Sequence, residues 1–249
     1  WVASSVHSHF RNATLDLADR QVAHVYRRYV KSGLIAAFAL TRLLDDFEPD
    51  VLLQFNGRQS STRVALELAQ ARGIRVVTHE SGKRAGRLCL AENEPATSLE
   101  PLHRVWAEWR DVPLDEDELA EVVAYFGDRE HGRAMYHTYS TAPDEPASVR
   151  QALGLRPDRP LWVVFTSSDD EVAADPQWQG PLPSQAGWIE RTVAWAAAHP
   201  GLDLVIRAHP NTGSTSSTGR NESLLRYYDE LGRRLPANCR LVGPTEQLS

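Results

Sequence analysis

Two stretches give the clearest indication of the fold: PDVLLQFNGR at residues 49–58 and LDLVIRAHPN at residues 202–211. Each contains an apolar run with the length of a buried β-strand and ends abruptly in polar residues that favour a turn. In open parallel α/β sheets, ligands bind in the crevice beyond the carboxyl ends of the strands. Both stretches carry an arginine among their polar residues. We therefore expect their ends to form the two halves of one cleft, which binds a small molecule with an anionic group.

The first stretch belongs to a predicted strand–helix–strand unit. Upstream of it, residues 15–47 carry apolar residues at helical spacing and predict two amphipathic helices. Residues 51–55 predict a buried strand, residues 62–71 a helix and residues 74–78 the next strand, with 79–82 as its exit loop. The unit has the length of about 30 residues that a parallel crossover requires.

The same pattern restarts after residues 141–146, a polar segment with two prolines that we interpret as a linker. Helices and strands alternate in this second half, which indicates a parallel sheet. Strands are predicted at 161–165, 204–206 and 240–242, and helices at 149–153, 188–198 and 223–235. Between the two halves, residues 83–113 have a mixed pattern, and helices are predicted at 115–126 and 129–139.

The predicted fold class is therefore α/β, with two Rossmann-like doubly wound domains that face each other across a cleft. The domains span residues 1–140 and 147–249. The chain starts at Trp1 and stops at Ser249 shortly after a strand-like run. We therefore expect this arrangement to be incomplete at both ends.

Composition narrows the classes of function. The chain has 33 acidic and 27 basic residues and a net charge of -6, which argues against a nucleic-acid binder with a generally basic surface. The longest uncharged apolar run, residues 33–40, is too short for a transmembrane segment. Cys89 and Cys239 lie far apart and indicate neither a disulfide framework nor a zinc site. The simplest interpretation is a reduced cytoplasmic protein without a bound metal.

The segment Asn56-Gly57-Arg58 follows the first predicted strand and precedes a helix. Gly57 permits a tight turn and a close approach of the backbone to a ligand. The amino end of the helix and the guanidinium of Arg58 both favour an anion. The alternative is an ordinary Asn-Gly turn followed by a surface arginine.

His79 and Glu80 follow the second predicted strand of the same unit. Both side chains are expected to reach the cleft, and either could act as a general base if its pKa is tuned. The alternative is a structural carboxylate that caps a helix or pairs with Arg84.

The segment TSSDDE at residues 166–171 opens a predicted loop of about 20 residues, a length more often functional than idle in a compact domain. Its hydroxyls, at Ser167 and Ser168, could hold a phosphate, and its acidic residues, Glu171 among them, could bind sugar hydroxyls. A magnesium site and a solvated acidic loop remain alternatives. Trp178, within the same loop, is a candidate for stacking on a ligand.

Arg207, His209 and Asn211 lie at the end of the second quoted stretch. Arg207 and His209 alternate along an extended segment, so their side chains are expected on one face. Two such groups beyond the end of a strand predict a diphosphate clamp. A structural histidine beside a surface arginine is the alternative.

The resemblance to a known family rests on four segments in this order: NGR at 56–58, HESG at 79–82, TSSDDE at 166–171 and RAHPN at 207–211. Together they resemble the capsule polysaccharide biosynthesis family of bacterial glycosyltransferases, over residues from about 45 to the end. The resemblance implies a GT-B fold, in which the N-terminal domain presents the acceptor and the C-terminal domain binds a nucleotide-activated donor. It places Arg207, His209 and Asn211 near the donor diphosphate, and Ser167, Ser168 and Glu171 in the same pocket. The family pattern continues with a Ser/Thr- and Gly-containing loop and a glutamate, but the chain stops before such a segment.

On the acceptor side, the resemblance places Asn56, Gly57 and Arg58 on the opposing wall of the cleft, with Glu80 or His79 as the base. The implied activity is transfer of a sugar from a nucleotide-sugar donor to a saccharide or other hydroxyl acceptor in bacterial surface polysaccharide synthesis. No cofactor is expected beyond this donor substrate, and no metal is required if Arg207 and His209 stabilise the leaving diphosphate. The expected location is the cytoplasm. Peripheral association of the full-length protein with the inner face of the membrane is left open.

Three other functions stay open. The first is transfer of a polyol phosphate from a CDP-activated donor. The second is a non-catalytic nucleotide- or saccharide-binding domain of a larger protein. The third is a sugar-nucleotide epimerase of similar architecture, which would form product without any acceptor.

Overall fold

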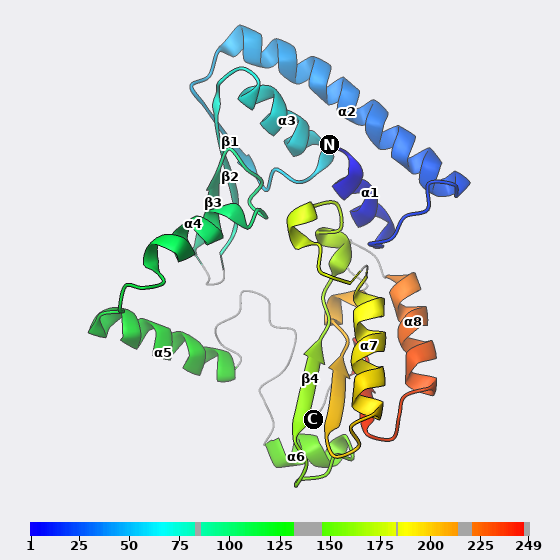
Figure 1. Cartoon of the computed structure of the whole chain (residues 1–249). Helices are drawn as coiled ribbons and strands as arrows, with labels where there is room; N and C mark the ends of the chain where they lie inside the picture. Colours follow the sequence, from blue (N-terminus) through cyan, green and yellow to red (C-terminus); the bar gives the residue numbers. More distant parts are fainter. Residues whose placement is uncertain (83–85, 132–145, 183, 214–220, 247–249) are drawn as a thin grey trace. The chain divides into compact units, whose positions relative to one another are not determined.

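The computed structural model describes residues 1–82, 86–131, 146–182, 184–213 and 221–246 (Figure 1). The chain forms two compact units. The first unit is Trp1–Val6 with Asp16–Ala142, and the second is His7–Leu15 with Pro143–Ser249. The short helix α1 (Ala3–Phe10) contributes residues to both. Most of the predicted linker lies outside the described residues.

The sheet of the first unit contains β1 (Val51–Phe55), β2 (Arg75–Ser81) and β3 (Leu88–Glu92), in that order. β1 and β2 are parallel, as predicted, but β3 pairs antiparallel to β2. The α/β class is thus confirmed, whereas the expectation of purely parallel sheets is wrong for this unit. The third strand comes from the segment whose sequence pattern was mixed.

Strand β2 is also longer than predicted. The sequence placed His79 and Glu80 in an exit loop, but both lie within the strand, because β3 continues the pairing as far as Ser81. Successive residues of a strand point to opposite faces of the sheet. This extension therefore separates the two candidate bases.

A single helix, α2 (Arg20–Phe47), replaces the two helices predicted at residues 15–47. Asp19 caps its start by accepting hydrogen bonds from Gln21 N and Val22 N. Gly33 does not interrupt it, because there the helix passes close to a neighbour: a Cβ at Gly33 would lie 3.3 Å from Val2 Cγ1. The missing side chain serves a close packing contact rather than a break.

The core of the first unit forms where α3 (Ser60–Gln70) covers one face of the sheet. Leu66 and Ala69 of α3 pack there with Leu44 of α2 and Val76 of β2. The unit also contains α4 (Glu100–Trp109) and α5 (Glu116–Glu130). Helix α5 starts with a capping box between Asp115 and Glu118. The helix predicted at 129–139 lies mostly outside the described residues.

The second unit has a parallel sheet in the order β4 (Leu161–Phe165), β5 (Asp203–Arg207), β6 (Cys239–Val242). The first helix of this unit after the linker is α6 (Pro146–Ala152). The crossovers are α7 (Gln185–Ala197) and α8 (Glu222–Arg233), which run beside the strands in Figure 1.

Helices α7 and α8 share one hydrophobic cluster with Leu204 and Ile206 of β5, so they cover the same face of the sheet. The other face is packed in part by Leu155 against Val205 and Val242. A doubly wound sheet requires strand order to reverse. The described strands β4, β5 and β6 follow chain order with both crossover helices on one face, as within one half of such a sheet, and the doubly wound arrangement stays a prediction.

The loop at residues 166–185 is not structureless. It contains the 3₁₀ turns η1 (Asp169–Glu171) and η2 (Pro176–Trp178), and a third, η3 (Pro210–Gly213), follows β5. Most of the Gly/Ser/Thr-rich segment after η3, residues 214–220, lies outside the described residues. Within the described parts of the chain, no helix is both long and apolar enough to cross a bilayer.

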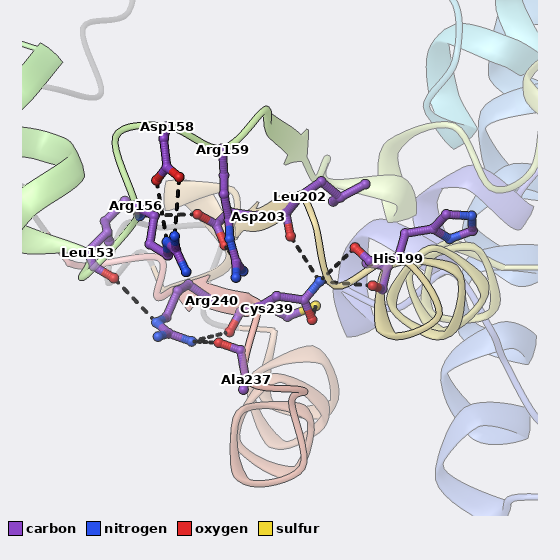
Figure 2. Close-up of polar contacts among 12 residues, drawn as sticks. Leu153, Arg156, Asp158, Arg159, His199, Leu202, Asp203, Ala237, Cys239 and Arg240 are labelled. Carbon is purple, nitrogen blue, oxygen red and sulfur yellow. Dashed lines mark hydrogen bonds and ion pairs between the residues drawn. The ribbon is translucent and has the colours of Figure 1, made fainter.

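A polar network ties together the amino ends of β5 and β6 (Figure 2). The side-chain amide of Asn238 donates to the carbonyls of Ala196, His199 and Leu202. Asp203, also buried, accepts from Arg156 N and lies 3.5 Å from Arg159 Nη1. Since these side chains bind backbone groups at the end opposite to Arg207 and His209, we interpret the network as structural.

Replacing Asn238 tests this interpretation. Asn238→Asp should lower the free energy of unfolding of the second unit more than Asn238→Ala, because both lose the donor to the three carbonyls but the carboxylate also buries a negative charge against their oxygens. Each variant leaves buried acceptors unpaired, a loss of about 1–3 kcal/mol per group. Urea denaturation gives the values, with the exposed change Gln151→Glu as the control. Equal stability of Asn238→Asp and the wild type would contradict the interpretation.

Candidate functional site

In the first unit, polar side chains gather at the carboxyl end of β1. The Asn56 backbone is left-handed (φ 58°), and the side chain is buried. Its amide donates to Glu80 Oε2 at 2.6 Å, and its Oδ1 accepts from Arg58 N. Asn56 thus joins the strand end, the following turn and the carboxylate of the neighbouring strand.

Gly57 follows with φ 78°. A Cβ at this position would lie 3.0 Å from Thr78 Cγ2 and 3.2 Å from the backbone of Pro95. The glycine therefore has a packing reason of its own, and no other residue fits without displacing the backbone of a neighbouring segment. This observation accounts for Gly57 without a ligand.

Arg58 turns toward the N-terminal segment of the same unit. Its Nη1 donates to Ser4 Oγ at 3.1 Å. Ser5 is engaged next to it, with Oγ donating to Gln59 Oε1 and accepting from Ser60 N. Sequence reasoning missed both serines, because 54 residues separate each serine from its arginine or glutamine partner and no local pattern marks them.

The two candidate bases diverge. His79 lies on the face of the sheet that carries Phe55, and the two rings meet edge to face with their centroids 5.7 Å apart. Glu80 lies on the opposite face, where Asn56 binds Oε2 and the backbone N–H of Ser81 binds Oε1. The two side chains therefore do not lie together, and Glu80 alone joins Asn56. Arg84, the alternative partner of Glu80, lies outside the described residues.

In the second unit, a charged cluster lies at the carboxyl ends of β4 and β5. We define it as Arg11, Asp170, Glu171 and His209. Arg11 Nη1 lies 2.9 Å from Asp170 Oδ2 and 3.9 Å from Glu171 Oε1. Both partners of the shorter pair are almost fully buried, with 5% of Arg11 and 1% of Asp170 exposed. Asp170 is therefore not part of a solvated acidic loop, whereas the neighbouring Glu171 is exposed.

Arg11 is the functional candidate that sequence reasoning missed. It lies 159 residues away from Asp170 in the chain and has a left-handed backbone (φ 50°). Its local sequence offers no signal, because the contact depends on segment 7–15 clustering with the second unit. Among the described residues, Arg11 Nε and Asp170 Oδ1 are left without a hydrogen-bond partner.

Burial shifts the pKa values of three groups at this end of the sheet. It raises the pKa of Asp170, and the charge of Arg11 opposes that rise. The pKa of Asp169 is also raised by burial. Burial lowers the pKa of His209; Glu171 acts in the opposite sense, whereas Arg11 and Arg207 lower it further. Near neutral pH, His209 is therefore a neutral imidazole rather than a cation.

The hydrogen bonds of His209 fix its tautomer. Asn211 N donates to Nδ1 at 3.1 Å, so the proton of the neutral ring is on Nε2, which acts as a donor. The backbone N–H of His209 donates to Thr166 Oγ1, which links the ends of β4 and β5. Asn211 Nδ2 lies 3.5 Å from Ser168 Oγ. Of the predicted donor residues, His209, Asn211, Ser168 and Glu171 thus come together.

Arg207 and Ser167 have other partners. Arg207 Nη1 donates to the carbonyl of Gly243 beyond β6. Burial lowers the pKa of Arg207, and Glu246 acts in the opposite sense. Ser167 is held by Gln185, whose amide accepts from Ser167 N at 2.7 Å and donates to Ser167 O at 3.1 Å.

Beside this cluster lies a pocket of about 530 Å³ in the same unit. Phe165, Trp178 and Trp188 form its aromatic walls, and Ser167 and Asp169 reach it from the end of β4. Trp178 is thus part of a concave surface, as a stacking residue must be.

No protein-family model, curated protein or solved structure matches this chain. The functional interpretation therefore depends on the geometry and on the resemblance of its ordered motifs.

Breaking the Arg11–Asp170 pair gives the first prediction from this site. Arg11→Ala should lower the free energy of unfolding by about 3–5 kcal/mol, because it leaves a buried carboxylate unpaired. Replacing both partners, as Arg11→Met with Asp170→Leu, should recover much of that loss. Denaturant unfolding measures all three proteins. Arg234→Ala, which breaks the exposed pair with Glu190, is the control and should cost at most about 1 kcal/mol.

The second prediction concerns pH. The unfolded chain protonates His209 near its usual pKa of about 6.5, whereas the folded protein does so only at lower pH. His209 therefore contributes full stability above about pH 6.5, and this contribution is lost as pH falls from there toward its folded pKa. Urea midpoints between pH 5 and 8 should decline less steeply for His209→Gln than for the wild type. His24→Gln, at an exposed position, is the control, and parallel curves would contradict the assignment.

Proposed function

We propose that the chain is part of a two-domain glycosyltransferase of the GT-B type, which transfers a sugar from a nucleotide-activated donor to a saccharide or other hydroxyl acceptor. The observation that carries the proposal is the cluster in the second unit. It places a neutral imidazole donor and a buried guanidinium, His209 and Arg11, at the carboxyl ends of two parallel strands. This is where α/β sheets bind ligands.

In this proposal, the donor diphosphate binds beyond β4 and β5. His209 Nε2–H donates to a phosphate oxygen, and the N–H groups of Arg207 that do not bind Gly243 supply positive charge. Arg11, which sequence reasoning did not include, is buried against Asp170 and contributes by holding the loop after β4 at this site. Donors aimed at charge that develops on a leaving group are usually the largest contribution to such reactions.

Glu80 is the proposed base. As the acceptor oxygen bonds to the anomeric carbon, the bond from that carbon to the diphosphate breaks, and the acceptor proton passes to the carboxylate. Asn56 and the Ser81 N–H hold this carboxylate in one orientation. A general base of this kind contributes about 10²–10⁴-fold to the rate. His79 is not included, since it lies on the other face of the sheet.

A non-catalytic domain that binds a nucleotide or saccharide is the second candidate. It is favoured by the same two hydrogen bonds of Glu80, because a carboxylate that ties two strands together also has a structural role. The two candidates differ in one measurable respect. An enzyme releases nucleotide in the presence of acceptor, whereas a binding domain has no turnover to lose.

A thermal-shift screen of the full parent protein against UDP-, GDP-, CDP- and CMP-sugars tests the proposal. We expect one nucleotide class to raise Tm, and Arg207→Ala to abolish that shift. The exposed change Arg191→Ala on α7 should leave it intact. Glu80→Gln should keep the shift but lower the rate of nucleotide release at least 100-fold.

Two outcomes of this screen would count against the transferase. A Tm shift without turnover in the wild type would favour the binding domain. The absence of a shift with every nucleotide sugar would contradict the donor site at β4 and β5.

A further inference from the structure

Among the described residues that line the aromatic pocket of the second unit, none is a lysine, arginine or histidine. Its walls are Phe165 at the end of β4, Trp178 of η2 and Trp188 of α7. All three are accessible, with 74%, 46% and 38% of each residue exposed. Exposed aromatic rings gathered around one cavity are a feature of ligand sites.

The rim of the pocket is polar but uncharged apart from Asp169. It includes the hydroxyls of Thr14, Ser167 and Ser184 and the amide of Gln179. A hydroxyl both donates and accepts hydrogen bonds, so several hydroxyls around an aromatic wall match a ligand that also carries several hydroxyls. Two of these groups have partners in the protein, since Ser184 Oγ accepts from Gly187 N and Gln179 Nε2 donates to the carbonyl of Ala173, but a fatty acyl chain would not use the donors and acceptors that remain.

A nucleobase fits this rim less well. Bases are recognised by donors and acceptors in fixed positions, and the backbone N–H and C=O of Ser167 would be such a pair. Both are already bound by the side chain of Gln185, at 2.7 Å and 3.1 Å. The Ser167 hydroxyl makes only a long contact, 3.4 Å to Gln185 Oε1, and can rotate toward a ligand in the pocket.

The pocket and the charged cluster are built from the same two segments. Segment 7–15 gives Arg11 to the cluster and Ala13 and Thr14 to the pocket. The loop after β4 gives Asp170 to the cluster and Asp169 to the pocket. The charged cluster and the aromatic pocket are therefore neighbours on both of these segments.

We infer that this pocket binds an uncharged pyranose ring of a saccharide, with Trp178 stacked against the C–H face of the ring. The ring hydroxyls bind Thr14, Ser167 and Asp169. The inference extends the proposed function to the class of ring that the second unit recognises. Binding here requires no nucleotide and no turnover, so it can be tested separately from the proposed function.

Saturation-transfer NMR with methyl pyranosides tests this inference on the whole chain. We expect transfer to the ring C–H protons of at least one neutral glycoside, such as those of glucose, galactose, mannose or N-acetylglucosamine. Transfer should be lost in Trp178→Ala and weakened in Trp178→Phe, which keeps an aromatic ring. Methyl glucuronide should give less transfer than methyl glucoside, since Asp169 repels its carboxylate and no cation lines the pocket.

Trp109→Ala is the matched control, because Trp109 is an exposed tryptophan of α4 outside this pocket. It should leave transfer unchanged, and circular dichroism should show that all variants are folded. Three results would overturn the inference: no transfer to any glycoside, transfer that survives Trp178→Ala, or Trp178-dependent transfer to free uridine, cytidine or guanosine alone.

This experiment separates the two proposals. Trp178-dependent binding of a glycoside in a protein without turnover would support the pocket and contradict the transferase. Turnover with nucleotide sugar but no Trp178-dependent glycoside binding would do the opposite.

Discussion

Parallel pairing between consecutive strands is the constraint on which both candidate sites depend. In β1–β2 and in β4–β5 the strands pair in register along their length, from Val51 with Arg75 and from Leu161 with Asp203. Parallel strands end at the same edge of a sheet, so the residues that follow them are brought together without any contact between distant loops. Asn56 therefore meets Glu80, and Thr166 meets His209, because of the backbone ladder. The chemistry of each site rests on this alignment.

The same ladder explains what the sequence could and could not predict. Strand β1 and the end of β4 were predictable because an apolar run stops abruptly at polar residues. The position of Glu80 relative to His79 was not, since it depends on β3, which extends β2 by pairing with it as far as Ser81. Within a strand, successive side chains point to opposite faces of the sheet, whereas residues of a loop have no such alternation. The reason for a glycine at position 33 of α2 is likewise a packing contact with Val2, which lies far away in the sequence.

Arg11 marks the limit of local reasoning more sharply. Its partner Asp170 is part of a run of three acidic residues, a pattern usually typical of a solvated loop. Only burial by a distant segment changes the meaning of that run, because a buried carboxylate needs a cation nearby. Burial also alters the role of His209, whose sequence context suggested a cation but whose lowered pKa makes it a neutral donor. Charge at this site is set by packing rather than by composition.

These effects divide the end of the second unit that carries the carboxyl ends of β4 and β5 into two chemical regions. Arg207 and His209 offer hydrogen-bond donors, and Arg207 also a positive charge, which suit phosphate oxygens, whereas the charge of Arg11 is buried against Asp170. The pocket beside them offers aromatic faces and hydroxyls without a cation, which suit a neutral ring. A glycosyl diphosphate has this same division between an anionic and an uncharged part. A site that only clamped phosphate would have no use for Trp178 and Trp188 at its side, and a site that only held sugar would have no use for the donors of Arg207 and His209. The coexistence of both regions on the same two segments is the strongest physical argument that one ligand spans them.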